Sequence, residues 1–307
     1  MVKKHKWLLL LAAFLLPVML FSALLVFEHF APFGEKSLLI MDMSDQYVEF
    51  FNGLRSGDVF FSWSKSLGTN YIGLFAYYVS SPFSVLTLFF SGETMHYGIL
   101  LLTLLKLGCV GLTSCIYFEK QWGVKGFASL IFSASCSMMS YCMAYSMCVM
   151  WLGGVIWLPV ILLGIENILA GDDPRLFRIS FLVCLLSTYY ITYMIVIFSV
   201  LYFLVRACED KTEAFWKKLF RFAGNGVITA GLAAFFVIPV LLSSFEGRVF
   251  NTLLGYSGTI MTVTFEISRD IGWDYLKKLG QQQVMQTQSA ADPPKKVAQG
   301  ERPVAAD

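Results

Sequence analysis

The chain has 307 residues, of which 57% are hydrophobic, 16% aromatic and only 14% charged. Soluble domains are about 45–50% apolar and about 25% charged. A single water-soluble core is therefore excluded, together with the disordered, collagen-like and disulfide-scaffold classes. The net charge of +2 is too balanced for nucleic-acid binding. Because the apolar excess requires lipid, the composition predicts an all-α polytopic membrane protein.

Apolar segments long enough to cross a bilayer recur along the chain. The first, 7–27, follows a basic N-terminus and carries no charge. As a helix it would be about 31 Å long, which matches the hydrocarbon core. We interpret it as a retained span with a cytoplasmic N-terminus rather than as a signal peptide. Seven spans are predicted in all: 7–27, 97–118, 127 to about 145, 151–170, two helices within 179–205, and 222–242.

The apolar block 179–205 allows two interpretations. As one straight helix, its 27 residues would be about 40 Å long, which is more than the membrane needs. The basic residues of 206–221 would then lie outside the cell. Two tilted helices that meet at 188–193 keep those basic residues on the cytoplasmic side, as the positive-inside rule requires. We therefore favour the pair of helices.

These spans divide the chain into five predicted parts. The parts are 1–27, the cytoplasmic N-terminus and first span; 28–96, an extracytoplasmic loop with interfacial helices; 97–242, a transmembrane bundle; 243–280, an extracytoplasmic segment; and 281–307, a polar tail without apolar periodicity. Within the long loop, 83–90 is apolar but too short to span, so we expect it to lie in the outer interface.

The most informative segment of the loop begins at Asp42. Its spacing predicts a helix with two faces, one aromatic and apolar, the other acidic and polar. The first face holds Tyr47, Phe50, Phe51 and Leu54, and the second holds Asp45, Glu49 and Asn52. Such a helix would lie along the membrane surface with its aromatic face down.

Two interpretations of the aspartates at the start of this helix remain open. A carboxylate near the outer headgroups could act as a general base on an acceptor hydroxyl. Alternatively, Asp42 caps the helix and Asp45 complements its dipole. The spacing alone favours capping, because a D-x-x-D pair is common.

Aromatic residues and one buried lysine add further candidates. The stretch 60–83 holds eight aromatic residues, among them Trp63. Such a density is typical of a membrane interface and would also suit stacking on a sugar. Lys106 lies about 13 Å into the second span, which costs about 2.5–3.5 kcal/mol if it is unpaired. We expect it to face either a carboxylate or a lipid phosphate.

Signatures of soluble chemistry are missing from the sequence. None of the seven cysteines belongs to a C-x-x-C pair, and the three histidines are far apart, so no cofactor is expected and a metal requirement cannot be read. There is no G-x-x-x-x-G-K-[ST] loop, no H-E-x-x-H and no G-x-S-x-G motif. These absences disfavour an ATP-driven pump more than an enzyme that uses a lipid-borne activated donor.

Six segments, in this order, resemble the bacterial YfhO-type membrane protein family, whose members are similar to glycosyltransferases of the GT-C fold. The segments are MDMSDQYVEFF at 41–51, WSKSLGTN at 63–70, AYYVSSPFSVLTLFF at 76–90, LLKLGCVGLTS at 104–114, VMWLGGVIWLPVILLGIE at 149–166 and TYYITYMIVIF at 188–198. The resemblance as a whole runs in the family's order over roughly residues 1–270.

The resemblance implies a multi-pass enzyme of the bacterial cell membrane. Such an enzyme would move a sugar from an undecaprenyl-phosphate carrier to an extracytoplasmic cell-envelope acceptor such as teichoic acid. Its partners would be the lipid-linked donor, the polymer acceptor and membrane lipid. The family's outer-loop aspartate falls on Asp42, which makes Asp42 the expected catalytic base and Asp45 the substitute. Gln46, Tyr47, Trp63 and Lys106 are the corresponding substrate-binding candidates, and Arg55 or Lys65 could offset charge on the leaving phosphate.

Two departures from the family pattern bear on these expectations. Gly153 follows Met-Trp-Leu where the family often has aspartate. The likeness also ends near Asp270, whereas family members are much longer, so the resemblance implies a truncated and inactive product as one alternative. The other rival is a transporter or flippase that moves lipid-linked sugars without transferring them.

Overall fold

The computed structural model describes residues 2–39, 42–64, 68–210 and 213–253, and side chains within 6–243. The chain divides into two compact units, 1–245 and 246–307. All features below belong to the first unit. The predicted boundaries at 280 and within the tail lie outside the described residues, as does Lys65.

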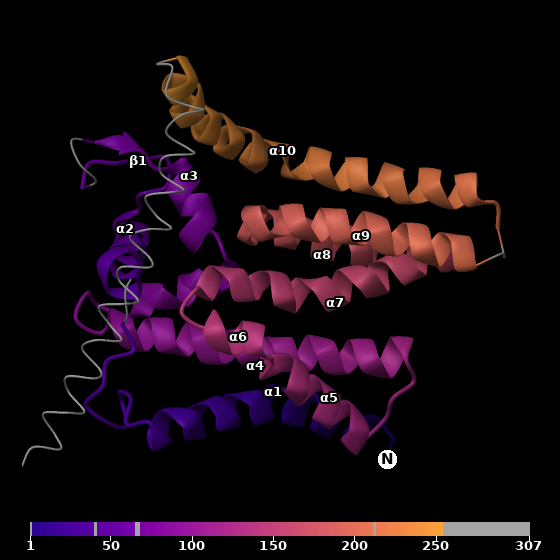
Figure 1. Cartoon of the computed structure of the whole chain (residues 1–307), viewed down its shortest axis with the longest axis horizontal. Coiled ribbons are helices and arrows are strands. Elements are labelled where there is room, and N and C mark those ends of the chain that lie inside the picture. The colour runs from indigo at the N-terminus through magenta and orange to yellow at the C-terminus, as the bar shows by residue number, and fades with distance from the viewer. Residues whose placement is uncertain (1, 40–41, 65–67, 211–212, 254–307) are drawn as a thin grey trace, which may run out of the picture. The chain divides into compact units, whose positions relative to one another are not determined.

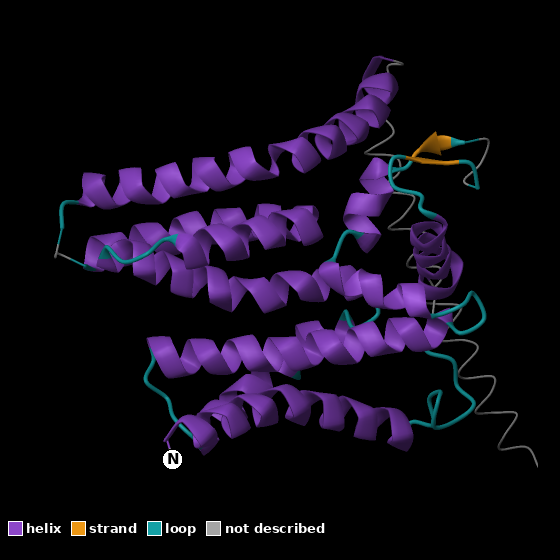
Figure 2. Cartoon of the chain, turned by 180° about the vertical axis from the view of Figure 1, so that it is seen from behind, coloured by secondary structure: helices purple, strands orange, loops and turns teal. Residues whose placement is uncertain are grey.

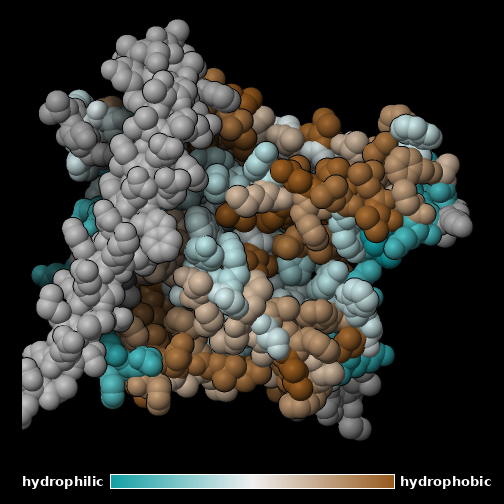
Figure 3. All heavy atoms as spheres, in the orientation of Figure 1, coloured by the Kyte–Doolittle hydropathy of each residue, from teal (hydrophilic) through white to brown (hydrophobic). Residues whose placement is uncertain are grey.

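Within the described ranges, five helices are long and apolar enough to cross a membrane. They lie side by side in the bundle of Figures 1 and 2. These helices are α1 (Val2–Phe27), α4 (Met95–Gln121), α7 (Val149–Ala170), α9 (Tyr189–Glu209) and α10 (Phe215–Leu253). Hydrophobic side chains cover much of the flank in Figure 3. The prediction of an all-α polytopic membrane protein is confirmed.

The remaining two predicted spans are shorter helices. The segment predicted at 127–145 forms α5 (Phe127–Ser137) and α6 (Ser140–Ala144), which are separated by an extended residue, Met139. As a helix of 11 residues, α5 would be about 16 Å long, roughly half the thickness of a bilayer core. It packs against α4 through a stripe of buried serines: Ser129, Ser133 and Ser137. Each serine hydroxyl donates to a backbone carbonyl, so the polar groups are satisfied inside the bundle.

The apolar block 179–205 forms a helical hairpin, as predicted. The helix α8 (Arg175–Ser187) ends at Thr188, whose φ of −154° and ψ of 56° interrupt the helix before α9 begins. Thr192 Oγ1 donates to the carbonyls of Cys184 and Thr188, both at 2.9 Å, in addition to the backbone N–H groups that these carbonyls accept. Phe177 of α8 and Phe203 of α9 both contact Phe222 of α10, so the two helices run back toward the same end of the bundle.

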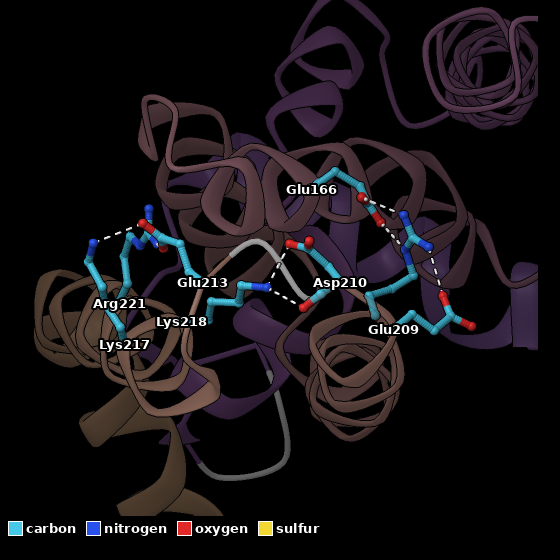
Figure 4. Close-up of polar contacts among 8 residues, drawn as sticks. Glu166, Glu209, Asp210, Glu213, Lys217, Lys218 and Arg221 are labelled. Atoms are coloured by element: carbon cyan, nitrogen blue, oxygen red, sulfur yellow. Dashed lines mark hydrogen bonds and ion pairs between the residues drawn. The ribbon is translucent and has the colours of Figure 1, made fainter.

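Most of the charged pairs lie at the end of the bundle where α7 and α9 end and α10 begins. We call this the Arg206 end. Arg206 binds Glu166 through two contacts, Nε to Oε1 at 2.8 Å and Nη2 to Oε2 at 3.1 Å. Lys218, whose side chain is fully buried, donates to Asp210 Oδ2 at 2.6 Å. Figure 4 shows these contacts linking α7, α9 and the loop into α10. They join α7 to α9 and Asp210, at the end of α9, to α10.

The opposite end, which we call the Asp42 end, is built from short elements. In chain order they are η1 (Met43–Tyr47), α2 (Val48–Ser56), β1 (Phe61–Ser62), β2 (Thr69–Asn70), α3 (Ile72–Leu74), η2 (Phe75–Val79) and η3 (Pro82–Phe89). The two strands pair antiparallel, with Phe61 opposite Asn70. The segments 72–79 and 82–89 meet at 90° and form either a broken span or a re-entrant loop, whereas 83–90 was predicted to lie in the interface.

The predicted two-faced helix after Asp42 is present as η1 and α2. Tyr47 and Phe51 are buried in an apolar cluster with Met95, Ile99 and other residues of α4 and η2. On the opposite face, Asp45 and Glu49 are exposed. The aromatic face thus rests on the ends of the bundle helices, and this contact fixes the direction of the first turn, where Asp42 lies.

Candidate functional site

Asp42 is exposed at the start of η1 and is held by a side chain one turn further along the chain. Gln46 Nε2 donates to Asp42 Oδ1 at 3.1 Å, and Tyr78 OH from η2 donates to Gln46 Oε1 at 3.3 Å. The side chain of Asp42 makes no capping hydrogen bond, so the capping interpretation is wrong for this residue. The chain Tyr78–Gln46–Asp42 instead leaves one carboxylate oxygen free to accept a proton.

Tyr47 lies beneath this group and is 5% exposed. Its hydroxyl donates to Cys148 Sγ at 3.8 Å, and its ring lies 5.3 Å from that of Tyr78. Burial raises the pKa of Tyr47 well above its usual range, and the nearby Cys148 and Asp42 add to the shift. Tyr47 is therefore a buried, neutral hydrogen-bond donor rather than a surface group that a substrate could contact.

An aromatic cluster continues from Tyr78 toward the start of α7. Tyr77 packs on Tyr78 at 4.7 Å, and Trp151 Nε1 donates to the Tyr77 hydroxyl at 3.0 Å. Tyr190, from the first turn of α9, lies 5.7 Å from Tyr77. Amphipathic rings whose polar tips are already arranged, beside a carboxylate, are suited to packing against the faces of a sugar.

A polar hollow of about 370 Å³ opens on one side of η1. Its carboxylates are Asp45, Glu49 and Asp58, and its other polar groups include Gln46, Ser62, Ser64 and Tyr71. Burial raises the pKa of Tyr71 to about 12, with a further contribution from Asp58. Ser62 donates to Asp58 at 2.6 Å. The hollow therefore offers several hydrogen-bond acceptors next to neutral hydroxyl donors.

An apolar hollow of about 230 Å³ opens on the other side of η1. Its walls come from the last turns of α1, the first turns of α4 and the loop after α6, and Met43 of η1 contributes to it. Met43 directly follows Asp42, whereas Gln46, which binds Asp42, lines the polar hollow. The helix η1, which follows Asp42, thus contributes to both an apolar and a polar hollow, and Asp42 itself lines neither.

Two residues expected to bind substrate, Trp63 and Lys106, and the substitute base Asp45 make no described contact with Asp42. Trp63 is 79% exposed on the turn of the β-hairpin and packs on Phe61, with ring centroids 4.9 Å apart. Asp45 accepts a hydrogen bond from Ser44 at 2.7 Å and faces the polar hollow. Lys106 is 1% exposed and donates to the Val149 carbonyl at 2.8 Å. Among the described residues its hydrogen-bond partner is a backbone carbonyl rather than the expected carboxylate, and its contact with a lipid phosphate stays a prediction.

Two features of the site were not found in the sequence. Tyr77 and Trp151 are 74 residues apart and carry no joint pattern. Gly153 lies where α7 meets the break at Thr188, and a Cβ atom on it would lie 2.6 Å from Thr188 Cγ2. The aspartate that the resemblance implies at this position would require Thr188 to move, because helix interfaces are close-packed. Within the described ranges, no group of three or more His, Cys, Asp or Glu side chains is arranged to hold a metal ion.

The fold and this site define a multi-pass membrane protein with an acidic, aromatic cluster at one end of its bundle. A profile of the family described as bacterial membrane protein YfhO matches residues 12–253. The chain therefore belongs to the YfhO family. It is 29% identical over 115 residues to the uncharacterised protein YfhO of Bacillus subtilis (strain 168). That alignment covers 36% of this chain and 13% of the relative, so the chain spans a small part of the relative's length. No solved structure matches the chain.

Proposed function

We propose that the chain is the membrane module of a glycosyltransferase that uses an undecaprenyl-phosphate sugar as donor. The Asp42 end would face outward, because the basic residues of the N-terminus and of the Arg206 end belong on the cytoplasmic side of a bacterial cell membrane. The acceptor would be a hydroxyl of a cell-envelope polymer, such as a teichoic acid. No nucleotide is needed, because the lipid phosphate is the leaving group.

In the proposed step, Asp42 acts as the general base. Its free oxygen takes the proton of the acceptor hydroxyl, and the acceptor oxygen forms a bond to the anomeric carbon of the sugar. The bond between that carbon and the phosphate oxygen breaks, so the lipid phosphate leaves with the electron pair. A single displacement inverts the configuration at the anomeric carbon. Gln46 would hold Asp42 in the geometry that this proton transfer needs.

The observation that carries the proposal is the exposed carboxylate of Asp42 at the start of a helix that contributes to two hollows of different chemistry. A lipid-linked sugar has an apolar tail and a polar head, and a polymer acceptor is rich in hydroxyl groups. The apolar hollow beside Met43 suits the first, and the carboxylates and hydroxyls around Asp45 and Tyr71 suit the second. The aromatic cluster of Tyr77, Tyr78 and Trp151 supplies faces for the sugar between them.

A transfer assay tests the proposal. The purified chain in lipid nanodiscs would be given radiolabelled undecaprenyl-phosphate glucose or N-acetylglucosamine together with lipoteichoic or wall teichoic acid. We expect label in the polymer, and no label when the same sugar is supplied only as its nucleotide derivative. Label that crosses the membrane of proteoliposomes without entering the polymer would contradict the proposal and identify a flippase. Absence of both transfer and transport with every donor would contradict it as well and identify a remnant.

A further inference from the structure

The short helix α5 leaves part of the bundle uncovered near the Asp42 end. The helix ends at Ser137, and the chain continues through α6 and a loop to Val149 without reaching the ends of α1 and α4 as a full span. In Figure 1, α5 and α6 lie beside the middle of α4, whereas α1 and α4 continue toward the Asp42 end. The segment 138–148 thus takes the place that a longer α5 would occupy beside α4.

The apolar hollow lies where α5 is missing. Part of its lining comes from Met143, Ser146 and Met147. These residues belong to the segment 138–148, which follows the short helix α5. Its walls are formed by Phe21, Leu24 and Leu25 of α1 and by Ile99, Leu100 and Thr103 of α4. Leu24 is 46% exposed, and its lipid-facing neighbours on α1, such as Leu20, are similarly exposed. The hollow is thus continuous with the surface that α1 presents to the membrane.

The chemistry of the hollow is that of a site for an amphiphile. Most of its lining is apolar; the polar residues are Glu28, His96, Thr103 and Ser146, and Glu28 forms an ion pair with Lys36 at 3.5 Å. The Lys36 ammonium also lies 5.7 Å from the centre of the Phe30 ring, another wall residue. Three methionines line the interior, and their flexible thioethers adapt to branched chains. The volume is below the roughly 300–1,000 Å³ of a site for a whole drug-sized ligand, so it suits one segment of a chain.

We propose that this hollow holds the polyprenyl chain of the lipid carrier next to its phosphate, and that the chain enters sideways over the end of α5. This inference rests on the proposed function, because it assigns the donor's lipid to the hollow beside Met43. The phosphate and sugar would then lie at the rim, adjacent to Asp42, while the rest of the chain extends into the bilayer along α1.

Photo-cross-linking of the intact chain in nanodiscs tests this assignment. The probe is an undecaprenyl phosphate that carries a diazirine in the isoprene unit nearest the phosphate, and the labelled residues are mapped by mass spectrometry. We expect label within 21–28, 96–103 and 143–147. The variants Leu24→Trp and Ser146→Trp fill the mouth and the floor, and each is expected to lower labelling about tenfold by excluding apolar groups worth ~0.8 kcal/mol per methylene.

Leu20→Trp is the matched control, because Leu20 is 45% exposed on the same helix and does not line the hollow. Equal labelling of the Leu20 and Leu24 variants, or label confined to α9 and α10, would overturn the inference. A diazirine phosphatidylglycerol that labels the hollow with the same yield and the same sensitivity to Leu24→Trp would also overturn it, in favour of an ordinary bilayer lipid. Thermal unfolding of each variant in detergent verifies that it is folded.

The outcomes separate this inference from the proposed function. Labelling of the hollow by the carrier probe, with no sugar transfer, supports the lipid site and rejects the glycosyltransferase. Sugar transfer by the same preparation, with the label elsewhere, supports the glycosyltransferase and rejects the lipid site.

Discussion

The two ends of the bundle use their carboxylates in opposite ways. At the Arg206 end, Glu166, Asp210 and Glu213 are each paired with a lysine or arginine side chain. At the Asp42 end, the described contacts of Asp42, Asp45 and Asp58 come from neutral donors: Gln46, Ser44 and Ser62. A carboxylate bound by a cation joins structural elements through a charge-assisted contact, whereas the three carboxylates of the Asp42 end contact amide and hydroxyl donors among the described residues.

This contrast predicts that substitutions at the two ends affect different measurements. Changes at the Arg206 end should lower the free energy of unfolding and leave chemistry intact in the molecules that remain folded. Changes at the Asp42 end should lower the rate of transfer with smaller effects on unfolding. A variant at the Arg206 end that lowers transfer but not stability, or one at the Asp42 end that lowers stability but not transfer, would contradict the comparison.

The largest effect on stability is expected for Asp210→Ala. Lys218 is fully buried, and the substitution removes the carboxylate that its ammonium binds while the hydrogen bond to the Asp210 backbone carbonyl remains. Loss of one partner of a buried pair costs about 3–5 kcal/mol, and we expect about 3 kcal/mol because the carbonyl remains. Unfolding in mixed micelles with increasing denaturing detergent measures it. A loss below the error of that titration would show that the pair does not hold the connection 209–215.

The next effect concerns Tyr71 and alkaline pH. Its folded-state pKa of about 12 exceeds the ordinary value of 10.0, so the unfolded chain releases the proton first and stability falls as pH rises from 10 to 12. By pH 11, the wild type is expected to lose about 1.4 kcal/mol more than Tyr71→Phe, which has no proton to release. Parallel pH profiles of the two proteins would contradict the burial of this hydroxyl.

A smaller effect is expected for Tyr78→Phe. The change removes the donor that holds Gln46 Oε1, so Gln46 orients Asp42 less well. Loss of one neutral hydrogen bond of about 1 kcal/mol corresponds to about fivefold slower transfer. The reduction should appear in kcat rather than in KM, because Tyr78 acts through Gln46. An unchanged kcat with a raised KM would instead indicate that Tyr78 contacts the substrate.

The smallest effect is expected for Asp173→Ala. Asp173 and Arg175 form an exposed pair with side chains 60% and 77% accessible. Exposed pairs contribute less than about 1 kcal/mol, and Asp173 Oδ1 also accepts the backbone N–H of Arg175 at 2.9 Å, so we expect unfolding to be weakened by about 1 kcal/mol or less and transfer to be unchanged. This variant is the control for Asp210→Ala, because it removes an aspartate at the same end without leaving a buried charge. A loss as large as that of Asp210→Ala would show that burial does not decide the effect.

The elements that could be predicted from the sequence are those whose formation depends on the spacing or length of a single apolar segment. The helix after Asp42 follows from the spacing of Tyr47 and Phe51, and the break at Thr188 follows from an apolar run too long for one span. The length of α5 did not follow, because 127–145 carries no charged residue that would mark an end and only its packing on α4 places its end at Ser137.

The site was predictable only in part for the same physical reason. Gln46 lies one turn from Asp42, so their contact is a property of a single helix. The contacts of Tyr47 with Cys148 and of Tyr77 with Trp151 join residues 101 and 74 positions apart, and no periodicity in the sequence encodes them. Lys106 was recognised as buried, but the carbonyl that receives its hydrogen bond depends on where α7 begins beside α4.

The most direct measurement compares sugar transfer by the wild type with that of Asp42→Asn and Asp45→Asn. Asparagine keeps the size of the side chain and the oxygen that Gln46 binds, but it cannot take a proton from the acceptor. We expect Asp42→Asn to reduce kcat by about 10²–10⁴-fold, the usual contribution of a general base, and Asp45→Asn to reduce it only a few-fold. Equal kcat values for the wild type and Asp42→Asn would contradict the assignment of Asp42 as the base.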